Sequence, residues 1–227
     1  MAELILFTLR RIALLAVAVG GLTGCAGLRP ASPPEFSAAL PANVRAAQDS
    51  VDVGWDVARL VPSALAQVEA KLGYAPRGFK VLVCRSECFT RHVRVSGAAA
   101  AAINDFVFVN ADLLAVTTNL QGVLAHELTH VLLSELRGRE LHKVPEWANE
   151  GLAVWASGVG TEGCAGASER LQRHHLCVAR RAADWLDGNG EAQRCWLQET
   201  LTGERDSACP EPVSPAFLAG TSPIPSR

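Results

Sequence analysis

The chain has 227 residues, 49% of them hydrophobic and 19% charged, with 21 Lys and Arg residues against 23 Asp and Glu residues. This composition excludes a disordered acidic or basic protein, a collagen and a coiled coil, and the length favours one domain with appendages. A formal net charge of −2 supplies no basic excess for binding nucleic acid. The unusual feature is an odd number of cysteines, seven.

The N-terminal region has the pattern of an export signal. Two arginines precede an apolar run at residues 12–19, which is too short to span a bilayer but is typical of a secretory signal. The sequence Leu22-Thr23-Gly24-Cys25 that follows resembles the lipobox of bacterial lipoproteins. The resemblance implies that residues 1–24 are a signal peptide and that Cys25 is the lipidated first residue of the mature protein.

This resemblance also implies a location. A lipid on Cys25 would anchor the protein in the bacterial cell envelope, and Ala26 after it favours the outer membrane, facing the periplasm. The alternative is an ordinary cleaved signal in which Cys25 has no role.

The other cysteines predict disulfides. Their number is even, as expected for an exported protein with structural disulfides, and they are Cys84, Cys88, Cys164, Cys177, Cys195 and Cys209. Pairing of nearest neighbours ranks first, because short loops close at the lowest entropic cost. A zinc–thiolate site is the competing interpretation, although the chain has no Cys-x-x-Cys pair.

Proline-rich segments set the expected domain limits. Residues 25–45 predict a flexible tether and residues 210–227 a disordered tail, which leaves a domain at residues 46–209. Apolar periodicity predicts its elements in order. They are a helix over 61–72 with Pro62 in its first turn, a strand over 79–84, a helix over 86–93, a strand over 106–110, and helices over 119–138, 145–157, 168–185 and 191–201.

The chemistry is concentrated in His126-Glu127-Leu128-Thr129-His130. Two histidines four residues apart on a helix project from one face, so both imidazoles can bind one Zn²⁺ ion. Glu127 lies beside them and can take a proton from water. Chance occurrence of these residues on a surface helix is the alternative.

A catalytic zinc site needs a third protein ligand. The metzincin pattern is excluded, because Leu133 and Leu136 stand where it requires glycine and histidine. The sequence HELTH followed by WANEGLA at residues 147–153 resembles the gluzincin metallopeptidases. By that resemblance His126 and His130 are the paired ligands, Glu127 is the general base, and Glu150 is the third ligand. Rivals for this third position are Glu146 and His142.

The resemblance implies peptide-bond hydrolysis, so the expected partner is a peptide or protein substrate. The downstream candidates for an oxyanion donor are His174 and His175, although a solvated helix face explains both. The thermolysin-like pattern has an aspartate four residues after the third ligand, where this chain has Val154. Trp147 and Trp155 are interpreted as core packing.

The expected fold class is α+β, with a small sheet packed against the active-site helix and a mainly helical half after it. The strand over 106–110 is the candidate for a sheet edge along which an extended peptide lies. The predicted function is a lipid-anchored, zinc-dependent peptidase. The alternative is a zinc-binding but non-catalytic envelope lipoprotein that acts as a scaffold or assembly factor.

Overall fold

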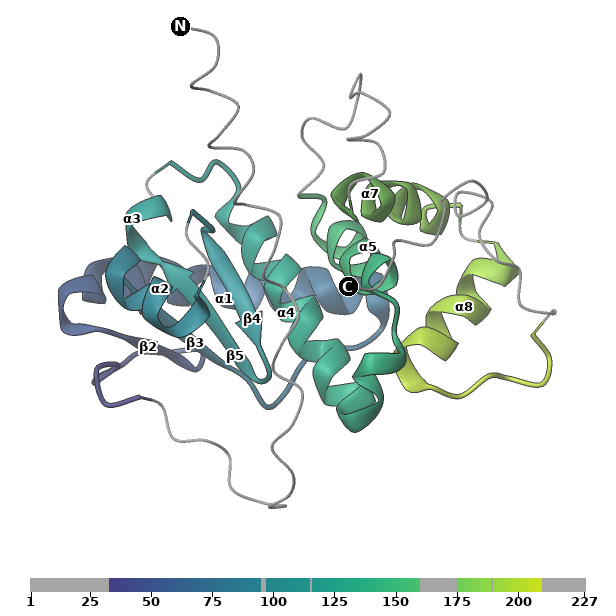
Figure 1. Ribbon diagram of the computed structural model, residues 1–227, viewed down its shortest axis with the longest axis horizontal. Helices are drawn as coiled ribbons and strands as arrows, with labels where there is room; N and C mark the ends of the chain where they lie inside the picture. Colours follow the sequence, from purple (N-terminus) through teal and green to yellow (C-terminus); the bar gives the residue numbers. More distant parts are fainter. Residues whose placement is uncertain (1–32, 95–96, 115, 160–174, 189, 210–227) are drawn as a thin grey trace, which may run out of the picture. The chain divides into compact units, whose positions relative to one another are not determined.

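A five-stranded mixed sheet forms the first half of the domain (Figure 1). Its spatial order is β1 (Ala38–Ala39), β2 (Val44–Ala46), β3 (Lys80–Cys84), β5 (Phe106–Asn110) and β4 (Ala100–Ile103). The three central strands β2, β3 and β5 are parallel, whereas β1 and β4 run antiparallel at the two edges. The sheet and the helices described below confirm the α+β class.

The computed structural model describes residues 33–94, 97–114, 116–159, 175–188 and 190–209. The chain from Glu35 onward forms one compact unit. The predicted signal peptide, Cys25 and the predicted tail lie outside the described residues. Among the helices that the structure describes, none combines the length and apolar character needed to cross a membrane.

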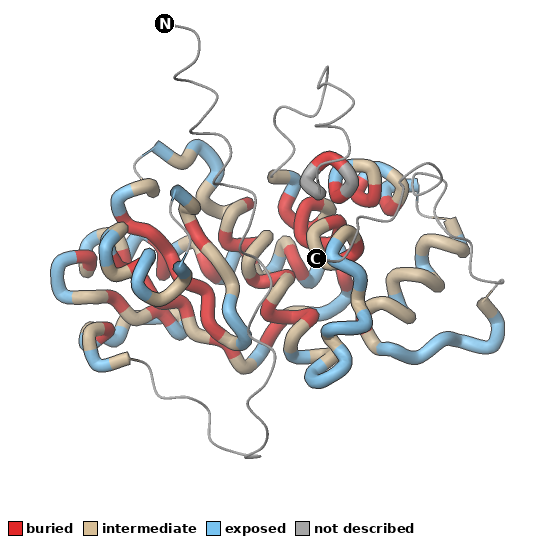
Figure 2. Tube along the Cα trace, viewed as in Figure 1, coloured by how far each residue is buried: buried red, intermediate tan, exposed pale blue. Residues whose placement is uncertain are grey.

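Helices cover both faces of the sheet. Val107 and Val109 of β5 pack into the main core with α1 (Val51–Leu72) and α4 (Leu120–Arg137). Phe106 and Phe108 point to the other face, where they meet Phe89 of α2 (Ser86–Val93). In Figure 2 the buried residues, coloured red, lie along the central strands of the sheet. Every residue of β5 is buried, as expected for a strand covered on both faces.

The helix predicted over 61–72 starts ten residues earlier, at Val51, so the prediction that Pro62 lies in its first turn is wrong. An internal proline costs a helix about 3 kcal/mol or more. Burial of Gly54, Val57 and Ala58 on the same face as Val61 offsets this cost. This longer buried face is what the sequence pattern failed to reveal.

The predicted tether over 25–45 is also too long, because residues 35–45 belong to the domain. Phe36 is only 1% exposed, and β1 and β2 extend the sheet. Pro41 lies in the turn between them, where its carbonyl accepts a hydrogen bond from the Val44 amide at 3.1 Å. Strands of two and three residues are too short to show a period in the sequence.

The strand over 106–110 is confirmed, but its predicted place at the sheet edge is wrong. β4, which pairs with β5 from Ala100 to Ile103, occupies that edge. The sequence of β4 is three alanines followed by Ile103, and one β-branched residue with no aromatic residue is too weak a signal to predict a strand. The short helix α3 (Ala111–Leu114) was not predicted either.

The second half is mainly helical, as predicted. The 3-10 helix η2 (Gly138–Lys143) leads from α4 to α5 (Glu146–Ser157), and α7 (His175–Leu186) and α8 (Glu191–Thr202) follow. α4 contacts α1 and the sheet as well as α5, and α5 packs on α7. The limits of α2, α4, α5 and α8 agree with the predicted limits within a residue or two. Of the helix predicted over 168–185, residues 168–174 lie outside the described residues.

Two of the predicted disulfides are confirmed, Cys84–Cys88 and Cys195–Cys209. Cys177 is disulfide-bonded as well. Its predicted partner Cys164 lies outside the described residues.

Gly151 allows α5 and α7 to approach closely, because a Cβ atom there would lie 2.6 Å from the Cβ of Ala182. We expect Gly151→Val to lower the free energy of unfolding by about 1–3 kcal/mol through overpacking. Urea denaturation measures this. Gln198→Val, at an exposed position of α8, is the control for a β-branched residue in a helix and should change stability far less. Equal stability of both variants would contradict this close packing.

Candidate metal centre

Helix α4 positions the two histidines of the HELTH sequence. Asn119 caps the helix, its Oδ1 accepting a hydrogen bond from the Gly122 amide at 2.9 Å. Leu124, Leu128 and Val131 bury one side of α4 in the core. His126, Glu127 and His130 lie outside this buried side of α4, and all three are only partly buried. The side chains of His126 and His130 are 14% and 16% exposed, so the helix presents them at the border between core and solvent.

Helix α5 brings Glu150 to these histidines. The Oε2 atom of Glu150 lies 3.5 Å from His126 Nε2, and its Oε1 atom lies 3.6 Å from His130 Nε2. One ligand atom from each of the three residues lies within 4.8 Å of the other two. Distances of 3.5 and 3.6 Å are long for hydrogen bonds but suit ligands grouped around one ion. Two imidazole nitrogens and a carboxylate oxygen form a donor set that suits a divalent transition metal.

The rivals for the third ligand lie apart from this group. Glu146 is exposed in the first turn of α5. His142 is exposed in η2, and its Nδ1 hydrogen-bonds to the Arg139 carbonyl at 2.8 Å. The structure therefore brings together the three predicted ligands His126, His130 and Glu150.

Gln67 of α1 connects the two helices that carry the ligands. Its Nε2 donates to the carbonyls of Ala156 and Ser157 at the end of α5, at 2.9 and 3.1 Å. Its Oε1 accepts from Gln121 Nε2, in the first turn of α4, at 3.0 Å. Sequence analysis missed Gln67, because it lies 89 residues from Ala156 and belongs to no motif.

Asn149 was also missed as a functional residue. Its Oδ1 lies 2.8 Å from His130 Nδ1. Since an amide oxygen only accepts, His130 donates through Nδ1, which leaves the lone pair of Nε2 directed at the ligand group. The one signal in the sequence is that Asn149 directly precedes Glu150.

In the part of the chain that the structure describes, the Nδ1 atom of His126 lacks a hydrogen bond like the one that His130 Nδ1 makes with Asn149. This atom is buried and has no hydrogen-bond partner among the described residues. Val154, which stands where the thermolysin-like pattern has aspartate, is 2% exposed and packs against Ala179 and Ala183. Val154 therefore offers no carboxylate, and no other described residue supplies a partner for the Nδ1 atom of His126.

Opposing influences set the pKa of His126. Burial disfavours the charged imidazolium, but the contact with Glu150 and the charges of Glu127 and Glu150 outweigh it and raise the pKa above 6.5. The nearby carboxylates therefore favour the protonated form of His126. A metal ion would replace that proton.

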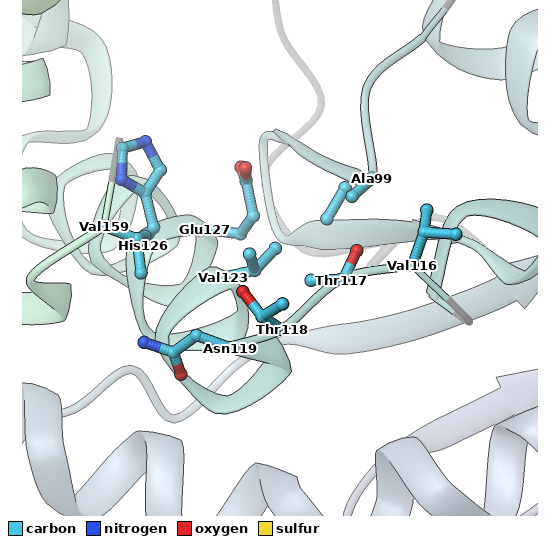
Figure 3. Close-up of a pocket in the computed structure, with 10 residues that line it drawn as sticks. Ala99, Val116, Thr117, Thr118, Asn119, Val123, His126, Glu127 and Val159 are labelled. Carbon is cyan, nitrogen blue, oxygen red and sulfur yellow. The ribbon is translucent and has the colours of Figure 1, made fainter. Parts of the chain in front are cut away.

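Glu127 lines a pocket of about 380 Å³ next to the ligand group. Figure 3 shows its carboxylate between His126 and Ala99, with Val116 and Thr117 beyond. Ala99 and Ala100, at the start of the edge strand β4, also line this pocket. A small molecule or an extended chain can thus reach Glu127 from the sheet edge.

The candidate oxyanion donors remain predictions. His174 lies outside the described residues, and His175 begins α7 without a described side chain. The tryptophans contribute to packing, as predicted. Trp147 stacks on Trp196 with ring centroids 5.5 Å apart, and Trp155 packs against the core while its Nε1 donates to Asp187 at 2.7 Å.

Comparisons of the chain with models of protein families, with curated proteins and with solved structures find no match in any of the three. The site must therefore be interpreted from its own geometry.

Removal of the Asn149 oxygen should weaken metal binding. We expect Asn149→Leu to lower the affinity for a divalent transition metal by about 10- to 100-fold, because His130 loses the group that orients it. Asn149→Asp is the matched control, since it keeps an oxygen acceptor and should keep the affinity. Competition with a chromophoric chelator measures both constants. Equal affinities for the two variants would contradict this role.

Metal affinity should also depend on pH. Protons compete with a metal for the imidazole of His126, whose pKa lies above 6.5. We expect affinity to rise by up to roughly tenfold per pH unit until the pH exceeds this raised pKa, and then to level off for this group. Calorimetry in buffers of different ionisation enthalpy measures the protons released. No proton release at the acidic end of the range would contradict the expected competition.

Proposed function

We propose that the protein is a zinc-dependent peptidase of the gluzincin type, lipid-anchored through Cys25 in the bacterial cell envelope. The observation that carries this proposal is the meeting of His126, His130 and Glu150 beside Glu127 at an accessible pocket. These are the residues that the HELTH and WANEGLA sequences single out by resemblance.

The donor set fits Zn²⁺. Two imidazole nitrogens and one carboxylate oxygen are a common ligand set of catalytic zinc, and three protein ligands leave one coordination position open. The partly buried carboxylate of Glu150 and the raised pKa of His126 are consistent with a site that a cation stabilises. When bound, zinc supplies Lewis-acid polarisation of a carbonyl and activation of water.

The chain's own residues supply the proton transfer and the orientation of the site. The Glu127 carboxylate lines the pocket, so it can accept a proton from water and deliver it to the leaving amine. Asn149 holds His130 in one tautomer. Gln67 keeps the helix carrying Glu150 in place relative to the helix carrying the histidines.

The edge strand β4 suits a peptide substrate. β5 occupies one side of β4, and the strand order ends with β4 on the other. No other described strand pairs with that outer side, so its backbone groups can bind an extended peptide by β-augmentation. Since Ala99 and Ala100 line the same pocket as Glu127, a peptide on this edge would pass the general base. β4 thus takes the role that the sequence assigned to residues 106–110.

A non-catalytic zinc-binding scaffold is the second candidate. It is favoured by the buried Nδ1 atom of His126, which has no partner among the described residues, because active sites usually orient both histidine ligands. In this case the zinc would stabilise the α4–α5 pair without turnover.

Glu127→Gln separates the two functions. We expect it to keep the zinc content and the fold but to lower peptide cleavage by roughly 10²–10⁴-fold, because the amide cannot accept the proton. Cleavage of a mixed peptide library, followed by mass spectrometry, measures this and also gives the specificity.

Glu146→Gln is the matched control, since Glu146 is an exposed glutamate one turn from Glu150. It should retain both zinc and activity. A zinc-loaded wild-type protein that cleaves no more of the library than Glu127→Gln would overturn the peptidase proposal and leave the scaffold.

A further inference from the structure

A second group of metal-ligating side chains lies on the opposite face of the sheet from α4. It consists of Glu35, Cys88 and His92, with one ligand atom of each within 4.8 Å of the other two. Cys88 and His92 are four residues apart on α2, so they project from the same face of that helix. Glu35 reaches them from the segment before β1.

Packing holds two of these ligands in place. His92 Nε2 lies 2.7 Å from Glu35 Oε1. The imidazole stacks on Phe108, with ring centroids 5.4 Å apart, and its centroid lies 5.6 Å from that of Phe36. The side chains of His92 and Glu35 are 21% and 33% exposed, so an ion from solvent can reach them.

The carboxylate is in the form that binds a cation. A backbone hydrogen bond and the contact with His92 lower the pKa of Glu35, which is therefore ionised at neutral pH. The donors around His92 and Glu35 thus match a divalent metal once a third ligand is available.

The sulfur of Cys88 cannot act as a good metal ligand while it is part of a disulfide. Cys88 is bonded to Cys84, the buried last residue of β3. A thiolate binds metals, whereas a disulfide sulfur is a poor ligand. The bond therefore leaves the group with two good donors, and its cleavage would supply the third.

We propose that reduction of the Cys84–Cys88 disulfide by a dithiol creates a second Zn²⁺ site, with Cys88, His92 and Glu35 as ligands. The dithiol loses two electrons and two protons and becomes a disulfide, while Cys84 and Cys88 each become a thiol. Zinc binding then releases the proton of the Cys88 thiol. The site does not depend on the proposed peptidase function.

A matched pair of variants tests this site without a reductant. Cys84→Ser and Cys88→Ser break the same disulfide, but only Cys84→Ser leaves the Cys88 thiol beside His92 and Glu35. Co²⁺ is the probe, because a thiolate ligand gives it a near-ultraviolet charge-transfer band that the sulfur-free His126–His130–Glu150 group cannot give.

We expect Cys84→Ser to bind one more Co²⁺ ion than Cys88→Ser and to show the thiolate band. Zn²⁺ should displace this Co²⁺. The double variant Cys84→Ser/His92→Gln should lose the band or bind Co²⁺ at least about tenfold more weakly, since it loses a nitrogen ligand. A band of equal strength in both single variants, or in neither, would overturn the proposal.

The intact disulfide provides a second test that does not depend on the folding of the serine variants. The full chain, treated with a phosphine reductant that does not hold the metal, is compared with His92→Gln treated in the same way. The phosphine takes up the oxygen of water and leaves two thiols. The wild type should gain the thiolate band on reduction, and His92→Gln should not. Equal bands would assign the binding to other thiols, such as those of Cys195 and Cys209, and would overturn the site.

Discussion

The candidate metal centre depends on the packing of α5 against α4. The histidines belong to one helix and the glutamate to the other, so the helices must be fixed to within a fraction of an ångström for the ligands to meet. Two features achieve this. Gln67 ties the end of α5 and the start of α4 to α1, and Gly151 lets α7 pack closely behind Glu150. The sheet supports α4 from its other side through β4 and β5.

The same packing concentrates charge at the centre. Glu127 and Glu150 lie near two partly buried imidazoles, and the pKa of His126 is raised as a result. Carboxylates in such a position are stabilised by a cation, and a proton on His126 is the smallest one available. Exchange of this proton for a metal couples the occupancy of the site to pH and to the stability of the fold. The Nδ1 atom of His126, which has no hydrogen-bond partner in the described part of the chain, is the least supported atom of this arrangement.

The elements and residues predicted correctly from the sequence are those that a local pattern determines. Asn119, Pro145 and Gly158 set the ends of α4 and α5, and helical spacing placed His126 and His130 on one face. The features that the sequence did not predict are those that depend on packing between distant parts of the chain. Pro62 inside α1, the short strands β1 and β2, and the alanine strand β4 are stabilised by neighbours distant in sequence. The partners Gln67 and Asn149 and the Glu35–Cys88–His92 group required the fold to be known.

The central claim is that His126, His130 and Glu150 bind one zinc ion. X-ray absorption spectroscopy of the zinc-loaded, non-reduced protein tests it most directly, because it identifies the atoms bound to the metal. The account predicts two imidazole nitrogens and a carboxylate oxygen at about 2.0–2.2 Å, an additional light atom, and no sulfur. Glu150→Ala should lose one oxygen from this shell. A shell that contains sulfur, or that is unchanged in Glu150→Ala, would contradict the assignment.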